Sequence, residues 1–210
     1  MDNIAFLIYS FSSLFAIVSP VGGVITFVSL TSDVTREEKN ALATKSVILA
    51  CIIALFFAVT GEIILNFFGV SIDALRVAGG ILLFTVAFDM ILAKVSRESI
   101  TDTEINKSQD RSDIWIFPIG LPLLTGPGTI TTVIVLMGSA ASILQNMAVL
   151  FAIMLTFLIT LILFRFSRRV YKFLGHTGML VFTRLMGLLL AAMAVNLIAL
   201  GIWNIYTSFQ

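Results

Sequence analysis

Ser19-Pro20-Val21-Gly22-Gly23-Val24-Ile25 and Gly126-Pro127-Gly128-Thr129-Ile130 each place proline and glycine in the middle of a long apolar segment. Proline removes a helix hydrogen bond, and neighbouring glycines loosen the backbone. Each segment is therefore predicted to be a helix broken into two halves at membrane depth, where irregular backbone is tolerated only inside protein or beside a cavity. Two broken helices in matching halves of a chain are typical of a transporter site.

The composition indicates the broad class of protein. Of 210 residues, 59% are hydrophobic and 12% are charged, and the mean hydropathy is +1.06. These values predict an integral membrane protein. The single cysteine, Cys51, excludes an internal disulfide and a cysteine metal cluster. A net charge of +1 without a long basic run gives no reason to expect nucleic acid as a partner.

Six segments are long enough to cross a hydrocarbon core, which takes about 20 helical residues. They cover residues 4–30, 46–68, 74–93, 114–137, 147–166 and 179–206. The first and fourth contain the breaks, and their length fits a helix plus a non-helical link. Polar connections are predicted at residues 31–45, 94–113 and 165–178. The expected fold is an all-α membrane protein with six transmembrane helices.

Lysine and arginine gather on the three polar connections, which share one side of a six-span chain. These residues are Arg36, Lys39, Lys45, Lys94, Arg97, Lys107, Arg111, Arg165, Arg168, Arg169 and Lys172. The positive-inside rule predicts that these loops are cytoplasmic and that both termini lie outside, in a multi-pass protein of the cell membrane. The basic cluster at residues 165–172 is expected to contact anionic lipid headgroups.

Similar residues recur at a nearly constant offset, which indicates an internal repeat. Pro127 follows Pro20 at the same offset at which Asn196 follows Asp89. Arg184 follows Arg76 at an offset that is longer by a single position. Each half holds three spans, an odd number, so the second half must enter the membrane inverted. The chain is predicted to consist of two inverted repeats, residues 1–105 and 106–210.

Four motifs in order resemble a known family. They are the Pro20-Val21-Gly22 break, Gly79-Gly80-Ile81-Leu82-Leu83-Phe84 with Phe88-Asp89-Met90, Leu123-Leu124-Thr125-Gly126-Pro127-Gly128-Thr129-Ile130, and Arg184-Leu185-Met186-Gly187-Leu188-Leu189-Leu190-Ala191-Ala192. Together they resemble the MarC family, also described as small neutral amino acid transporters, over essentially the whole chain. The resemblance implies two inverted repeats of three spans and transport of glycine, alanine and similar amino acids, driven by an ion gradient. Many relatives have asparagine where Ser19 stands.

The breaks also predict a substrate site on physical grounds. A half-helix that starts in mid-membrane presents free N–H groups and the positive end of its dipole, which suit a carboxylate. Gly22-Gly23 and Gly128-Thr129 are the predicted starts, and nearby hydroxyls add hydrogen-bonding groups for a small zwitterion. The alternative is that proline and glycine only kink the helices or let them pack closely. The predicted substrate-binding residues are Ser19, Pro20, Gly22, Gly23, Thr26, Thr125, Gly126, Pro127, Gly128 and Thr129.

Two carboxylates inside predicted spans are candidates for ion coupling, because charge in the bilayer is costly. Asp89 is preferred, since its repeat partner Asn196 lies deep in the last span and favours a shared inward-facing position. Its alternative is a boundary residue that pairs with Lys94. Glu62 is the second candidate, and its alternative is a shallow position near the headgroups.

Two arginines and a set of small residues have alternative interpretations. Arg76 and Arg184 either neutralise a substrate carboxylate or reach from a span end to the interface. Gly187, Ala191 and Ala194 permit close packing of the last span against another helix of the chain or of a second copy.

The predicted function is a secondary transporter of small neutral amino acids such as glycine, alanine and serine. It is coupled to a proton or sodium gradient and works by alternating access between the broken helices. Export of amino acids or other small metabolites, a channel, and a non-transport membrane scaffold remain alternatives. No HExxH motif, nucleophile elbow or nucleotide-binding loop occurs, and there is one histidine. The chain is therefore not expected to be an enzyme or to hold a cofactor or metal.

Overall fold

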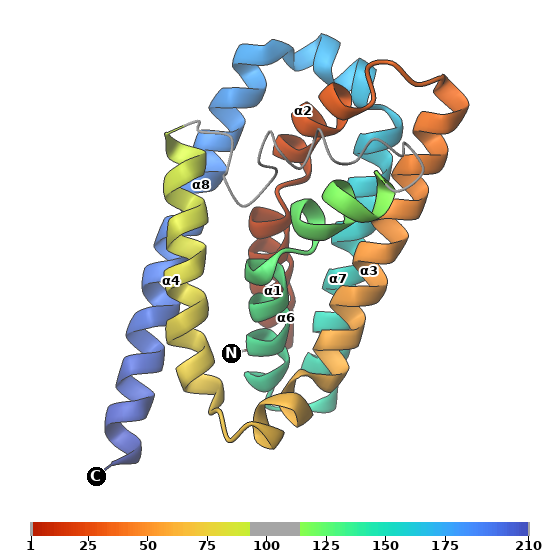
Figure 1. The fold of residues 1–210 in the computed structure, drawn as a ribbon. Helices are drawn as coiled ribbons and strands as arrows, with labels where there is room; N and C mark the ends of the chain where they lie inside the picture. Colours follow the sequence, from red (N-terminus) through yellow and green to blue (C-terminus); the bar gives the residue numbers. More distant parts are fainter. Residues whose placement is uncertain (1, 93–113, 210) are drawn as a thin grey trace.

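The computed structural model describes residues 2–92 and 114–209. This part of the chain is helical throughout and contains no strand. The elements in chain order are α1 (Asn3–Val18), α2 (Pro20–Leu30), α3 (Arg36–Phe67), α4 (Ile72–Ile91), η1 (Trp115–Leu124), α6 (Pro127–Gly138), α7 (Ile143–Arg165) and α8 (Ser167–Ser208). Figure 1 shows them as a bundle of long helices.

The helices confirm the predicted all-α membrane fold. Among the described residues, five helical segments are long and apolar enough to cross a membrane, with α1 and α2 counted together. There are six when the bent pair η1 and α6 is counted as one span. The predicted boundary between the repeats, at residues 105 and 106, lies outside the described residues.

Two predicted connections are wrong in their extent. α3 begins at Arg36, inside the connection predicted at residues 31–45, because Thr35 and Glu38 form a capping box that starts the helix early. α8 begins at Ser167, inside the connection predicted at residues 165–178, and bends within its length at Gly175, where φ is 66°. Glycine takes this conformation without steric cost.

The second and fifth spans start in the same way, at the offset that also separates Pro20 from Pro127. The Thr35 hydroxyl accepts a hydrogen bond from the Glu38 N–H at 3.3 Å, and Glu38 accepts one from the Thr35 N–H at 2.9 Å. The Ser142 hydroxyl accepts from the Gln145 N–H at 3.3 Å, and Gln145 accepts from the Ala141 N–H at 2.8 Å. Each side-chain pair satisfies N–H groups that a helix start leaves without partners.

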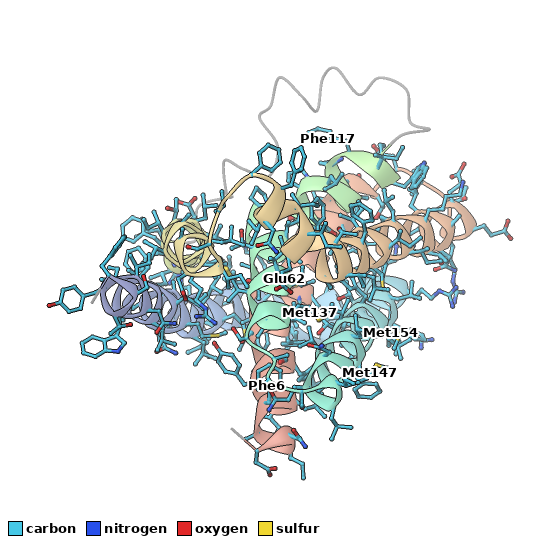
Figure 2. All side chains as sticks on the ribbon, turned by 90° about the horizontal axis from the view of Figure 1, so that it is seen from below. Phe6, Glu62, Phe117, Met137, Met147 and Met154 are labelled. Carbon is cyan, nitrogen blue, oxygen red and sulfur yellow. The ribbon has the colours of Figure 1, made fainter. Side chains whose placement is uncertain are left out.

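Helices from both halves of the chain contribute to each part of the bundle. α1 and α6 lie in the middle, with the α4–α8 pair on one side and α3 and α7 on the other (Figures 1 and 2). We call the end with the C-terminus and residues 68–71 the terminal end, and the opposite end, with residues 31–35, the basic end. α1 starts toward the terminal end, so α1 and α6 run in opposite directions through the centre.

Close glycine contacts hold α4 against α8, which is the largest helix contact described. A Cβ atom on Gly80 would lie 2.9 Å from the Ala194 carbonyl oxygen. A Cβ on Gly187 would lie 3.0 Å from the Ala87 carbonyl oxygen. Helix backbones this close leave no room for a larger residue, and small residues at such contacts are usual between membrane helices.

We expect Gly80→Ala and Gly187→Ala each to lower the thermal midpoint of the protein in detergent, because overpacking at a backbone contact costs about 1–3 kcal/mol. Tryptophan fluorescence during heating measures the midpoint. Gly178→Ala is the matched control, since its Cβ would meet only the Leu174 Cβ at 3.5 Å. Equal midpoints for all three variants would contradict the close contact.

Candidate functional site

The first span breaks at Ser19, as predicted. Ser19 adopts a left-handed conformation with φ 44° and ψ 62°, and α2 starts at the next residue, Pro20. This start lies two residues before the predicted Gly22, because proline fits the first position of a helix, where no N–H is needed. The Ser19 N–H donates to the Phe15 carbonyl at 3.1 Å, so α1 keeps its last hydrogen bond.

The Ser19 hydroxyl oxygen is buried beside Gly22. It has no hydrogen-bond partner within residues 2–92 and 114–209. A Cβ on Gly22 would lie 2.8 Å from this oxygen and 3.3 Å from the Thr183 hydroxyl of α8. Gly22 therefore leaves a small space between two hydroxyl groups. A buried hydroxyl without a partner needs a polar group from water or a ligand.

The fourth span breaks at Gly126, where η1 and α6 meet at an angle of 53°. Gly126 is extended, and α6 begins at Pro127, one residue before the predicted Gly128. The Thr125 hydroxyl donates to the Ala50 carbonyl of α3 at 3.1 Å, which fixes the break to a neighbouring span. The Thr129 hydroxyl donates to the Leu124 carbonyl at 3.2 Å. Both hydroxyl oxygens can still accept a hydrogen bond.

The half-span before this break is less regular than predicted. η1 has π-type hydrogen bonding and contains Pro118 and Pro122. Phe117 and Leu121, just before these prolines, have extended backbone with φ of −128° and −131°. Proline disfavours helical geometry in the preceding residue and supplies no N–H, which accounts for the distortion. Only one break in this span is predicted from the sequence.

The two breaks lie side by side in the centre of the bundle. A Cβ on Gly128 at the start of α6 would lie 2.9 Å from Ile17 Cδ1 at the end of α1. It would lie 3.1 Å from Leu83 Cδ2 of α4. The glycine lets apolar side chains from two other helices reach the start of α6, and a larger residue would displace them.

A cavity of about 620 Å³ opens on the terminal side of the breaks. It is lined by α1, α4, α6 and α8 together with residues 141 and 145, and its size suits a small-molecule ligand. Its deep end reaches Leu83, which contacts Gly128, and Thr132, whose hydroxyl donates to the Gly128 carbonyl at 2.8 Å. Phe6, which is labelled in Figure 2 and lies near the start of α1, lines this cavity. The cavity thus leads toward the second break.

A charged network stands in the same cavity wall. Arg76 pairs with Asp73 at 2.5 Å and donates to the hydroxyl of Ser139, the residue that follows α6, at 2.6 Å. Asn204 of α8 donates to the same Asp73 oxygen at 3.0 Å. Three helices are therefore joined around one guanidinium. The sequence indicates Arg76 as a candidate for binding a substrate carboxylate but does not identify its partners. The i, i+3 spacing of Asp73 and Arg76 is the sequence signal that indicates their ion pair.

The predicted site residues take different positions relative to this cavity. Nine of the ten predicted substrate-binding residues lie within four residues of a break, and Thr26 lies farther along α2; none of the ten lines the cavity. Of the predicted ion-coupling residues, Asn196 lines the cavity, whereas Asp89 is half-buried on α4 and Glu62 is exposed on α3. The structure therefore brings the two breaks together but does not gather the three ion-coupling residues.

Aromatic packing fixes α2 at the basic end. The Phe27 ring stacks on the Phe164 ring of α7 with centroids 4.4 Å apart, and Gly23 leaves room for the same Phe164 ring. Lys39 of α3 adds a cation to this contact, since its Nζ lies 5.4 Å from the Phe27 centroid. A cation within this distance of a ring face is attracted to it. The packing therefore joins α2 to both α3 and α7.

We expect Ser139→Ala to lower the free energy of unfolding by about 1–3 kcal/mol, because it removes the acceptor of a charged, half-buried hydrogen bond. The loss should be much smaller when Ser139→Ala is added to Arg76→Met. Denaturant unfolding in mixed micelles gives the free energy of unfolding of the unmodified protein, the two single variants and the double variant. Ser208→Ala, at an exposed position, is the control. Equal losses in both backgrounds would contradict the network.

Residues 4–206 match the family described as MarC family integral membrane protein. UPF0056 membrane protein YvbG of Bacillus subtilis is 38% identical over 203 residues, which cover 96% of each chain. UPF0056 membrane protein MJ1677 of Methanocaldococcus jannaschii is 39% identical over 200 residues, covering 95% of this chain and 97% of the relative. UPF0056 membrane protein YhcE of Escherichia coli is 39% identical over 199 residues, covering 93% and 91%. No solved structure matches the chain.

These matches extend over nearly the whole chain, and they agree with the apolar helices of the structure. They bear out the resemblance carried by the four sequence motifs. The chain belongs to the MarC family of multi-pass integral membrane proteins.

Proposed function

We propose that the protein is a secondary transporter that moves small neutral amino acids such as glycine, alanine and serine across the cell membrane. The observation that carries this proposal is that two broken spans meet beside a 620 Å³ cavity whose deep end reaches Leu83, next to Gly128 of the second break. Irregular backbone at membrane depth is tolerated where it is buried in protein or lines a cavity. Paired broken helices around such a point are the usual construction of a transporter site.

The substrate carboxylate binds the start of α6 or of α2. The first N–H groups of each half-helix have no partner within the helix, and the helix dipole is positive there. At α6 these groups belong to Gly128 and Thr129, which are buried next to the cavity's deep end. At α2 the Ser19 hydroxyl, which has no partner among the described residues, supplies a further polar contact. The limited space beside Gly22 and Gly128 favours a small side chain.

The basic end faces the cytoplasm, and the terminal end faces outward. Lys39, Lys45, Arg168 and Arg169 all lie on the basic-end segments of α3 and α8, where the positive-inside rule requires them. In this orientation the cavity admits solute from outside. Movement of one repeat against the other then exposes the central site to the cytoplasm, as alternating access requires.

A proton or sodium gradient drives uptake through a carboxylate. Asp89 is the preferred coupling residue, because it is half-buried on α4, the helix that also supplies Leu83 to the cavity. Glu62 is exposed at the surface of the described part of the chain, where it is less able to sense occupation of the cavity.

The test is uptake of labelled glycine and alanine into proteoliposomes under imposed proton or sodium gradients. We expect concentrative uptake by the unmodified protein and at least about a tenfold loss in Gly128→Leu, since the added side chain meets Ile17 and Leu83 at the site. Gly178→Leu is the control, because position 178 is not confined by another helix. Saturable uptake also separates a transporter from a channel.

Absence of uptake by folded protein under both gradients would contradict import of these amino acids. Efflux from preloaded vesicles would then identify an exporter, and absence of flux in either direction would favour a scaffold.

Asp89→Asn tests the coupling step separately. We expect gradient-driven accumulation to fall by about tenfold or more, because the amide does not titrate or attract a cation as a carboxylate does. Exchange of labelled for unlabelled glycine without a gradient should continue. Glu62→Gln serves as the comparison at an exposed carboxylate. Unchanged accumulation in Asp89→Asn would exclude Asp89 as the coupling residue.

A further inference from the structure

Helix contacts in this bundle occur in matching pairs. α1 packs on α7, and η1, which stands at the equivalent place in the second half, packs on α3. α4 packs on α6, and α8 packs on α2. Exchanging the two halves of the chain therefore maps each of these contacts onto another one. A two-fold axis in the membrane plane has this effect.

Individual contacts between α4 and α8 follow the same rule. Gly80 faces the Ala194 carbonyl, and Gly187 faces the Ala87 carbonyl. Gly187 follows Gly80, and Ala194 follows Ala87, at the offset that separates the two prolines of the breaks. We call two residues related by this offset counterparts. The Gly80–Ala194 contact and the Gly187–Ala87 contact exchange each residue for its counterpart. Both contacts can form together only if the two helices are antiparallel and related by the two-fold axis.

The same holds for the large side chains at this contact. A Cβ on Gly80 would meet Ile198 Cγ1 at 2.6 Å, and a Cβ on Gly187 would meet Ile91 Cγ1 at 3.1 Å. Ile91 and Ile198 are again counterparts. The correspondence therefore extends over several turns of both helices.

This register places Leu83 level with Leu190. Each leucine lies three residues after its glycine, Gly80 or Gly187, in helices that run in opposite directions. Leu83 and Leu190 are themselves counterparts, so the axis passes between them. Their side chains are 1% and 0% exposed, and both line the cavity. The cavity from the terminal end thus stops at the axis of the bundle.

We propose that a second cavity enters from the basic end and stops at the same leucine pair. Its wall is formed by the counterparts of Thr132, Met193 and Asn196, which line the cavity already described. These counterparts are Ile25 of α2 and Val86 and Asp89 of α4, and all three are half-buried. The inference rests on the proposed transport function, since alternating access requires a route to each side of one site.

The two routes take the same small zwitterionic solute, and among the three counterpart pairs named above they differ in charge at one. Asn196 presents a neutral amide to the route from the terminal end, whereas Asp89 presents a carboxylate to the route from the basic end. A carboxylate in a low-dielectric wall attracts the solute's ammonium group or a coupling cation. Leu83 and Leu190 contact the apolar side of the solute in both routes and limit its size.

The experiment labels single cysteines with a charged, membrane-impermeant methanethiosulfonate reagent, in a Cys51→Ser background. Right-side-out and inside-out membrane vesicles expose the two ends in turn. We expect Thr132→Cys and Met193→Cys to react from the terminal end, and Ile25→Cys and Val86→Cys from the basic end. The difference between sides should be about tenfold, because the charged reagent cannot cross the membrane and reaches a reactive thiolate only through water open to its own side. Leu188→Cys, at an exposed apolar position, is the lipid-facing control.

Leu190→Cys should react from both sides, which would show that the routes share their end point. Resistance of both Ile25→Cys and Val86→Cys to reagent from the basic end, while Thr132→Cys reacts, would overturn the second cavity. The labelling needs no substrate, so the two proposals fail separately. If the labelling pattern holds and amino acid uptake is absent, the two cavities stand and only the assigned solute is wrong.

Discussion

Backbone hydrogen bonding in an apolar surrounding is the constraint on which the rest of this structure depends. A chain that interrupts two helices at membrane depth must satisfy or shelter the freed N–H and C=O groups. Here the Gly23 N–H donates to the Ser19 carbonyl and the Ile130 N–H donates to the Gly126 carbonyl. Each half-helix therefore regains the i to i−4 hydrogen bonds of an α-helix within one turn. The interrupted helices α1 and α6 lie in the centre of the bundle, where other helices cover what is left.

Covering the breaks requires the surrounding helices to come close. Glycine permits this at the α4–α8 contact and at the start of α6, where Leu83 and Ile17 reach Gly128. The same small residues that tighten the bundle also leave the limited spaces near the breaks. Gly22 differs from the glycines at the α4–α8 contact, because it stands between the hydroxyls of Ser19 and Thr183 rather than against another helix backbone.

Hydropathy and proline position were sufficient to predict the spans and the two breaks. They act through local chemistry, since about 20 apolar residues cross a bilayer and proline interrupts a helix wherever it stands. The cavity was not predictable in this way, because its wall combines residues such as Tyr9, Arg76 and Asn204 from distant parts of the chain. The early start of α3 was missed because hydropathy does not register a capping box, and the distortion of η1 because one break already explained its length.

The reciprocal contacts of α4 and α8 have the form of an isologous interface, the kind that joins two identical subunits. In a symmetric pair of half-length chains, each substitution would appear on both sides of the membrane at once. Joining the halves in one chain removes that restriction, so a residue and its counterpart can diverge independently. Asp89 and Asn196 are one such pair, since they share the offset of the other counterparts but carry a carboxylate and an amide.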